Sequence, residues 1–214
     1  MERTSEPRGY FVALNTMTDA GAWHRYRPHL NRLREIHGGR DLVSAQPLVA
    51  ALGPVPNSVL TIVEHATVSQ LHRLLSNPEY RALSGKLAAL AFGPAWAVPG
   101  VSPPPRALPE GHEPRAYLVA RYEVIDLDRL QTFLDLIERL VASHGGRFLV
   151  RLQLSDNLAG PPDGWYLSLV EFISLRHLQQ GIQSSDLRDM ASLRTGHGAI
   201  EYWMATARAT GSAA

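Results

Sequence analysis

The sequence repeats itself at a fixed spacing, and this repeat limits the possible folds more than any other feature. His37-Gly38-Gly39-Arg40 recurs as His144-Gly145-Gly146-Arg147, 107 positions later. The same offset, without a gap, aligns Tyr10 with Tyr117, Gly53-Pro54 with Gly160-Pro161, Val63-Glu64 with Val170-Glu171, and Trp96 with Trp203. Such a pattern predicts two fused copies of one structural unit of roughly a hundred residues.

Charge and residue usage argue against several classes of function. The formal net charge is +1, from 21 basic and 20 acidic residues, so nothing electrostatic favours nucleic acid or a membrane surface as a partner. The chain has no cysteine, which excludes disulfides, thiolate nucleophiles and iron–sulfur clusters. We see neither a signal peptide nor an apolar run of membrane-spanning length, and therefore expect a cytoplasmic protein.

Hydrophobic periodicity predicts the order β-α-β-β-α-β in each half, which is the ferredoxin-like motif. The expected strands are 10–14, 40–46, 58–65 and 95–98 in the first half, and 147–154, 165–172 and 200–205 in the second. A helix is expected at about 126–143, with a counterpart in the first half capped by Thr18 or Asp19, and glycine pairs end both helices. Thr67 and Ser174 are expected to cap the second helices, the first of which is interrupted near Asn77-Pro78.

These elements define an α+β fold of two ferredoxin-like halves, 9–98 and 115–207. The intervening segment 99–114 contains Pro103-Pro104-Pro105 and is expected to be a semi-rigid linker. Two such halves in one chain are expected to pair into an intramolecular, pseudo-dimeric α/β barrel. The assembly would then be a monomeric pseudo-dimer or a homodimer.

Several motifs resemble a domain-of-unknown-function family of the dimeric α/β-barrel superfamily. They are the tyrosine in the first strand, the His-Gly-Gly-Arg helix end, Phe148-Leu149-Val150, Val170-Glu171-Phe172 and Asn77-Pro78-Glu79-Tyr80. The resemblance covers both halves. It implies kinship with cofactor-independent monooxygenases of antibiotic biosynthesis, polyketide cyclases, haem-handling enzymes and ligand-binding modules. Fold alone does not choose among these functions.

A comparison of the two halves points to a site in the first one. Several apolar positions of the second half are polar, or carry larger aromatic rings, in the first. At the offset of 107, Leu130, Phe133, Leu134 and Leu136 become Trp23, Tyr26, Arg27 and His29, Phe172 becomes His65, and Tyr122 becomes Asn15. An apolar pocket with a few convergent polar groups is the usual form of a ligand site.

We therefore predict catalytic roles for His65, Arg27 and Asn15. Histidine titrates near neutrality and can act as a general base, and an amide or guanidinium can stabilise a developing oxyanion. Contacts to the substrate are predicted for Trp23, Tyr26, His29 and Glu64.

Structural interpretations of the same residues remain open. Trp23 and Tyr26 could be large core residues, and Arg27 could extend its aliphatic stem to the surface. His65 and Asn15 could be strand ends, with the histidine exposed to solvent. Glu64 shares a strand face with apolar residues, so an ion pair with an arginine explains it as well as a catalytic carboxylate.

The favoured function is a cofactor-independent enzyme of secondary metabolism that acts on a hydrophobic aromatic or polyketide-like molecule. Oxygenation, cyclisation, isomerisation and dehydration all fit this description. The alternatives are a non-catalytic small-molecule-binding barrel and a haem-binding member of the same superfamily. No histidine spacing matches a known metal-ligand pattern, so neither a metal nor a cofactor is expected.

Overall fold

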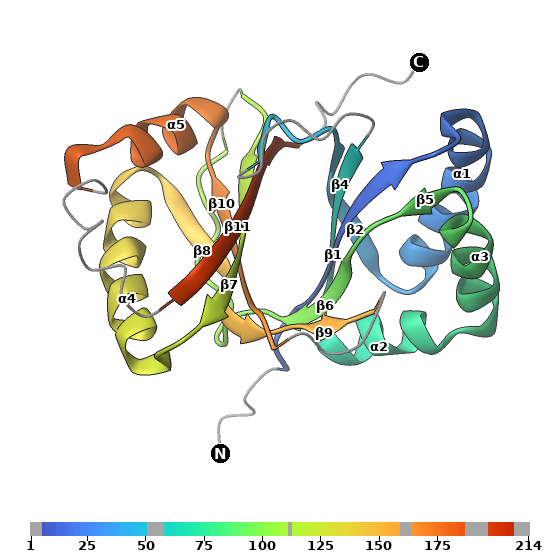
Figure 1. Cartoon of the computed structure of the whole chain (residues 1–214), viewed down its shortest axis with the longest axis horizontal. Coiled ribbons are helices and arrows are strands. Elements are labelled where there is room, and N and C mark those ends of the chain that lie inside the picture. The colour runs from blue at the N-terminus through green and yellow to red at the C-terminus, as the bar shows by residue number, and fades with distance from the viewer. Residues whose placement is uncertain (1–5, 51–57, 111–112, 159–163, 187–196, 208–214) are drawn as a thin grey trace.

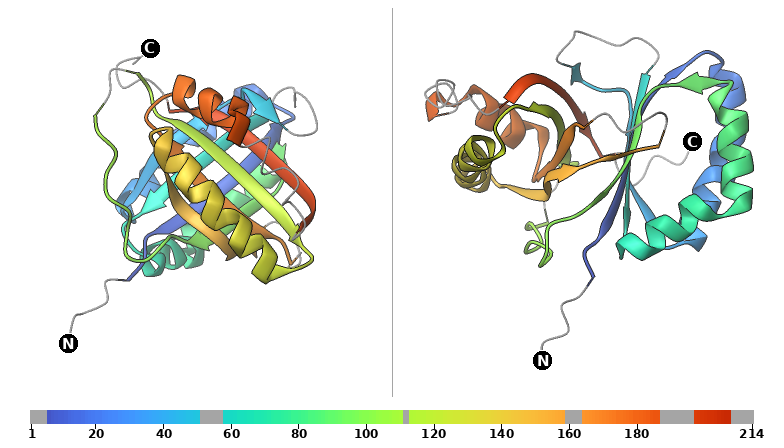
Figure 2. Two further views of the ribbon diagram at one scale, coloured as in Figure 1. Left: turned by 90° about the vertical axis from the view of Figure 1, so that its left-hand side faces the viewer. Right: turned by 60° about the horizontal axis from the view of Figure 1, so that its bottom comes forward.

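The computed structural model describes residues 6–50, 58–110, 113–158, 164–186 and 197–207. Two antiparallel sheets lie face to face, and helices cover their two outer faces (Figure 1). Figure 2 shows the same layers from two further sides. The predicted α+β class is confirmed. Within the described ranges, no helix has both the length and the apolar character needed to cross a bilayer.

The first sheet is built almost entirely from the first half of the chain. Its strand order is β2-β4-β1-β6-β9, and β5 pairs with β1 beside this path. The elements are β1 (Gly9–Met17), α1 (Ala20–Ile36), β2 (Gly39–Ala45), β4 (Ser58–His65), α2 (Val68–Ser76), α3 (Pro78–Ala88), β5 (Ala91–Phe92) and β6 (Ala95–Pro99). Helices α1, α2 and α3 cover its outer face (Figure 1).

The second sheet has the order β3-β11-β7-β10-β8. Its elements are β7 (Ala116–Val124), α4 (Leu127–Ser143), β8 (Gly146–Leu154), β10 (Tyr166–Phe172), α5 (Leu175–Gln183) and β11 (His197–Thr206). Helices α4 and α5 cover its outer face (Figure 1). The bounds of α1 and α4, and those of α2 and α5, differ by the same 107 positions that relate the sequence motifs.

Local sequence explains where the long helices begin and end. Asp19 accepts a hydrogen bond from the Ala22 N–H at 2.8 Å, and Asp126 accepts one from the Arg129 N–H at 3.1 Å. Beyond each C-terminus a glycine takes the left-handed conformation, with φ of 73° at Gly38 and 67° at Gly145.

The second helices differ in how they are capped. Thr67 accepts from the Gln70 N–H at 3.1 Å, as predicted. Ser174 occupies the equivalent position but makes no capping hydrogen bond, because its hydroxyl instead contacts Nδ1 of His177 at 2.8 Å. Ser174 thus takes the predicted N-cap position but without the side-chain hydrogen bond that Thr67 makes.

The predicted interruption near Asn77-Pro78 is confirmed as the boundary between α2 and α3. Asn77 ends one helix and caps the next, with Oδ1 accepting from the N–H groups of Glu79 and Tyr80. Pro78 follows at the first helical position, where its missing N–H costs nothing. The turn sets α3 across the outer face of the first sheet.

Alternate side chains of both sheets form one core between them. From β1 this core takes Tyr10, Val12 and Leu14, and from β7 it takes Tyr117 and Val119. At its centre Trp96 and Trp203, one from each half, lie 5.8 Å apart between ring centroids. Neither inner face could be exposed without a large loss of apolar burial.

Each sheet is completed by a two-residue strand from the other half. β9 (Asp156–Asn157) pairs with β6, and β3 (Val49–Ala50) pairs with β11. The pairs Trp96–Asn157 and Trp203–Ala50 are equivalent: at the offset of 107, Trp96 corresponds to Trp203 and Ala50 corresponds to Asn157. The described hydrogen-bonded ladders do not join the two sheets into a closed barrel.

Candidate functional site

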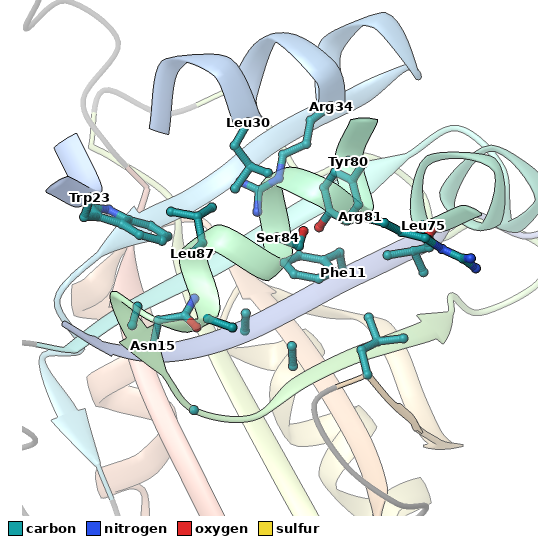
Figure 3. Close-up of a pocket in the computed structure, with 16 residues that line it drawn as sticks. Phe11, Asn15, Trp23, Leu30, Arg34, Leu75, Tyr80, Arg81, Ser84 and Leu87 are labelled. Carbon is teal, nitrogen blue, oxygen red and sulfur yellow. The ribbon is translucent and has the colours of Figure 1, made fainter. Parts of the chain in front are cut away.

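A cavity of about 540 Å³ lies between the first sheet and its covering helices (Figure 3). The outward-facing residues of β1, namely Phe11, Ala13 and Asn15, form its floor. They alternate with the residues that face the intersheet core, as strand geometry requires. The site is therefore on the helix-covered side of the sheet.

The helices supply the opposite wall. Trp23, Leu30 and Arg34 of α1 point into the cavity, because spacings of seven and four place them along one helical stripe. Ser84 of α3 adds a hydroxyl to this wall (Figure 3). Small residues where β5 and β6 begin keep the space open. Among them Gly93 has φ of 152°, and a Cβ there would lie 1.9 Å from the Leu14 carbonyl oxygen.

Arg34 is the most informative residue of the cavity. It is only 6% exposed, and its guanidinium carbon lies 5.2 Å from the centroid of the Phe11 ring. Its nearest carboxylate is that of Asp41, where Nη1 to Oδ1 is 3.8 Å, at the outer limit of an ion pair. The Nε atom is buried without a hydrogen-bond partner. A buried guanidinium with spare donors is a strong site for an anionic oxygen.

Sequence comparison of the halves missed Arg34, although the signal was present. At the offset of 107 its counterpart is Val141, another apolar-to-polar exchange. The exchange falls one helical turn beyond Leu30, in the last turns of the helix. Extending the comparison along the whole apolar stripe of α4 would have found it.

Asn15 and Trp23, two of the residues predicted from the sequence, line the cavity together. Asn15 lies on the sheet, and Arg34 reaches into the cavity from α1 (Figure 3). Trp23 is 6% exposed and also belongs to the buried cluster between α1 and α3. The cavity thus has a mainly apolar lining with a few polar groups among it.

Three other predicted residues of α1 do not line this cavity. Tyr26 is half-buried and packs against the cluster between α1 and α3. Arg27 is half-buried. His29 is exposed. Only His29 points away from the stripe that carries Trp23, Leu30 and Arg34, whereas Tyr26 and Arg27 flank that stripe without lining the cavity.

His65 is fully buried on the helix-covered face of β4, so the solvent-exposed interpretation is wrong. Its Nδ1 lies 3.3 Å from the His37 carbonyl oxygen, and a Cβ at Gly39 would lie 2.9 Å from its Cε1. Burial lowers the pKa of this imidazole, and the nearby Arg34 charge lowers it further. His65 packs under the His-Gly-Gly-Arg turn and does not line the cavity.

Glu64 faces the opposite side of the first sheet. Its carboxylate accepts from Arg8 at 2.7 Å, Arg40 at 3.0 Å and the Tyr10 hydroxyl at 3.0 Å. Burial and the adjacent carboxylate both raise the pKa of Tyr10. The arrangement is the ion pair named as the structural alternative, and it contributes nothing to the cavity.

The second half has a matching cluster around Glu171. The Tyr117 hydroxyl donates to this carboxylate at 3.1 Å, and Nε of Arg147 donates at 2.7 Å. Burial, followed by the charge of Glu171, raises the pKa of Tyr117. Because the cluster occurs in both halves, it belongs to the common framework.

Among the described residues, the outer face of the second sheet carries apolar side chains at several positions that correspond to the cavity lining of the first half. Tyr122, Leu130 and Phe133, the counterparts of Asn15, Trp23 and Tyr26, are all buried in one continuous cluster. Val141 and Phe148 join the same cluster. In this half, apolar side chains occupy the positions of Arg34 and Asp41.

Metal ligation has no support in the described ranges, where no group of three or more histidine, aspartate or glutamate side chains could hold an ion.

Comparison with known proteins identifies the fold. Residues 115–207 match the model of a domain of unknown function, DUF1330. No curated protein sequence matches the chain.

Solved structures resemble nearly the whole chain at very low sequence identity. One, from Fusobacterium nucleatum subsp. nucleatum, carries the provisional name of monooxygenase; its TM-score is 0.59 at 9% identity, with 95% of this chain and 94% of that chain covered. An anthrone oxidase-like protein gives 0.56 at 10% identity, covering 99% and 98%. A mutant chlorite dismutase from Candidatus Nitrospira defluvii gives 0.56 at 12% identity, covering 95% and 92%. At these identities the likenesses show a shared fold and nothing more.

Proposed function

We propose that the cavity of the first half binds a hydrophobic aromatic or polyketide-like small molecule, and that the protein is an enzyme acting on it without an external cofactor. The cavity carries this proposal: its volume of about 540 Å³ falls within the range of roughly 300–1,000 Å³ typical of small-molecule sites. Its walls are mainly apolar, and Asn15, Ser84 and Arg34 supply the polar groups that would orient a ligand. We further propose a cytoplasmic role in secondary metabolism.

We also propose that the chain is a duplicated unit, with halves 9–98 and 115–207 joined by the linker 99–114 in a pseudo-dimeric barrel. The reciprocal pairing of β3 and β9 supports this, because an isologous interface gives each contact twice. A chain that provides both subunits of the barrel would be complete as a monomer.

The reaction favoured within this proposal is oxygenation of an electron-rich ring. Two fold relatives carry the names monooxygenase and anthrone oxidase-like protein. Oxidation of a ring methylene by dioxygen keeps one oxygen atom in the new carbonyl and releases the other as water. Four electrons leave the carbon and four enter dioxygen, so no external reductant is needed. The protein would position the ring and stabilise negative charge on oxygen.

The haem alternative fits these residues poorly. Haem iron takes an axial histidine, cysteine, methionine or tyrosine. Among the described residues that line the cavity, tyrosine is the only one of these types, and Tyr80 is packed into the cluster between α1 and α3.

Oxygen uptake with a set of hydroxylated anthrones tests the proposal, and binding is followed separately by tryptophan fluorescence. We expect one dioxygen consumed per substrate oxidised. Ser84→Phe, which places a ring inside the cavity, should abolish both binding and uptake. The exposed Thr132→Phe on α4 is the matched control and should retain both.

Binding without turnover would leave only the alternative of a non-catalytic binding protein. Absence of binding by any aromatic compound, or equal binding by Ser84→Phe, would overturn the proposed site itself.

A further inference from the structure

We infer that the ligand of this cavity is an organic anion, an aromatic ring system whose carboxylate, enolate or phenolate oxygen binds the Arg34 guanidinium. The inference rests on the proposed function, because it names the chemical class of the molecule held in the same cavity. It concerns the charge of the ligand on entry and is independent of the reaction that follows.

The first argument is that the buried Arg34 guanidinium lacks a close anionic partner among the described residues. A guanidinium has five N–H donors and stays charged throughout the physiological pH range. This one is 6% exposed, its Nε has no partner, and the Asp41 carboxylate approaches only to 3.8 Å. The contrast with Arg121, the other buried arginine described, lies in the carboxylate distance: Arg121 donates to Glu201 at 2.8 Å. Arg34 has no carboxylate at so short a distance among the described residues.

The second argument is the chemistry of the lining. The polar side chains that reach the cavity are Asn15, Arg34, Tyr80, Arg81 and Ser84, and no carboxylate or imidazole is among the described lining residues. The site therefore has cations and hydrogen-bond donors but no group suited to remove a proton near neutral pH. An acidic molecule that has already lost its proton needs no such base.

The third argument is geometric. Arg34 extends from α1 toward the Phe11 ring on the cavity floor (Figure 3). A planar ligand lying along the apolar floor would bring an oxygen at its edge to the guanidinium. Asn15, on the floor of the cavity, would then face another part of the ring system (Figure 3).

A pair of fluorescent probes separates charge from hydrophobicity. 8-Anilinonaphthalene-1-sulfonate carries an anionic oxygen group, and N-phenyl-1-naphthylamine has the same rings without it. We expect the wild-type protein to bind the anionic probe more tightly by about tenfold to a hundredfold, the range of a charge-assisted hydrogen bond in a buried site. Ser84→Phe should weaken both probes, which shows that they occupy this cavity.

Arg34→Met should lose the preference for the anion while keeping its affinity for the neutral probe. Arg34→Lys keeps the charge but lacks the planar fork, and should retain part of the preference. Arg32→Met removes the same charge from an exposed position of α1 and should behave as wild type. Circular dichroism of each variant verifies the fold, and the lysine variant keeps the test decisive if the methionine variant is unfolded.

The outcomes distinguish this inference from the proposed function. Equal binding of the two probes by wild type, or an unchanged preference in both Arg34 variants, overturns the anion inference and leaves a hydrophobic site. Failure of both probes to bind wild type would sink the proposed cavity function and the inference with it.

Discussion

At the scale of the residue, Arg34 and Val141 occupy the same position of their halves in opposite environments. Arg34 borders a cavity with its charge weakly paired, whereas Val141 is buried in a filled apolar cluster. Replacing a buried charge by an apolar side chain of similar length is often neutral or stabilising. We therefore expect Arg34→Met to leave the free energy of unfolding within about 1 kcal/mol of wild type, or to raise it.

The reverse exchange is the matched control for urea denaturation. Val141→Arg would place an unpaired charge against Phe148 and Phe172, and should lower the free energy of unfolding by about 3 kcal/mol or more. If Arg34→Met destabilised the protein as much as Val141→Arg does, Arg34 would be a structural residue.

His65 gives a prediction for the pH dependence of stability. Its folded-state pKa lies below the ordinary value of 6.5, so just below that pH the unfolded chain binds more protons than the folded one. The free energy of unfolding should therefore fall as the pH drops below 6.5, by at most about 1.4 kcal/mol per pH unit from this group. His65→Phe, which copies Phe172, should flatten that dependence between pH 7 and 5 in urea titrations. An unchanged slope would contradict the assignment.

Single residues also show how far sequence reasoning reaches a site. Comparing the halves located Asn15 and Trp23, because substitutions that open a cavity leave a trace at equivalent positions. It could not separate Tyr26, Arg27 and His29 from them, since a helix turns neighbouring residues through 100° and only packing decides which side chains reach the cavity. Strand alternation placed Glu64 on a face with apolar residues, but the burial of His65 at the strand end required the structure.

At the scale of the element, the break between α2 and α3 positions one wall of the cavity. Asn77 caps α3, whose Tyr80 and Ser84 line the site. Asn77→Ala should lower the free energy of unfolding by about 1 kcal/mol and weaken binding of the neutral naphthylamine probe several-fold, because the first turn of α3 would fray.

Asp126→Ala removes the cap of α4 in the second half and provides the comparison. It should cost a similar free energy of unfolding without changing probe affinity. Equal loss of binding in both variants would mean that the effect is global and not local to α3.

Elements with strong local signals were predictable, and those without were not. Both long helices carry an aspartate at the start and glycines at the end, and Asn77-Pro78 marks a turn, so their bounds followed from the sequence. β3 and β9 are two residues long and pair with strands of the other half. Nothing in two residues distinguishes such a strand from a loop, because its hydrogen-bond partners are distant in sequence.

At the scale of the whole molecule, the shared core between the sheets makes the halves depend on each other. Tyr10, Val12 and Trp96 pack in the same cluster as Tyr117, Val119 and Trp203. We expect one cooperative unfolding transition, with tryptophan fluorescence and far-ultraviolet circular dichroism giving coincident curves in urea. Two resolved transitions would show that each half is stable alone. The repeat predicted two units, whereas the exchange of β3 and β9 between them required the structure.

The presence of both sheets on a single chain has a consequence for how such a protein can evolve. In a symmetric dimer, every mutation appears in both subunits, so a change that opens one pocket opens two. Here a gene can alter one half and leave the other untouched. A lineage could thus accept the energetic cost of a charged cavity under α1 and α3 while the half beneath α4 continues to supply stability. Selection for binding and selection for folding could then act on different residues of one sequence.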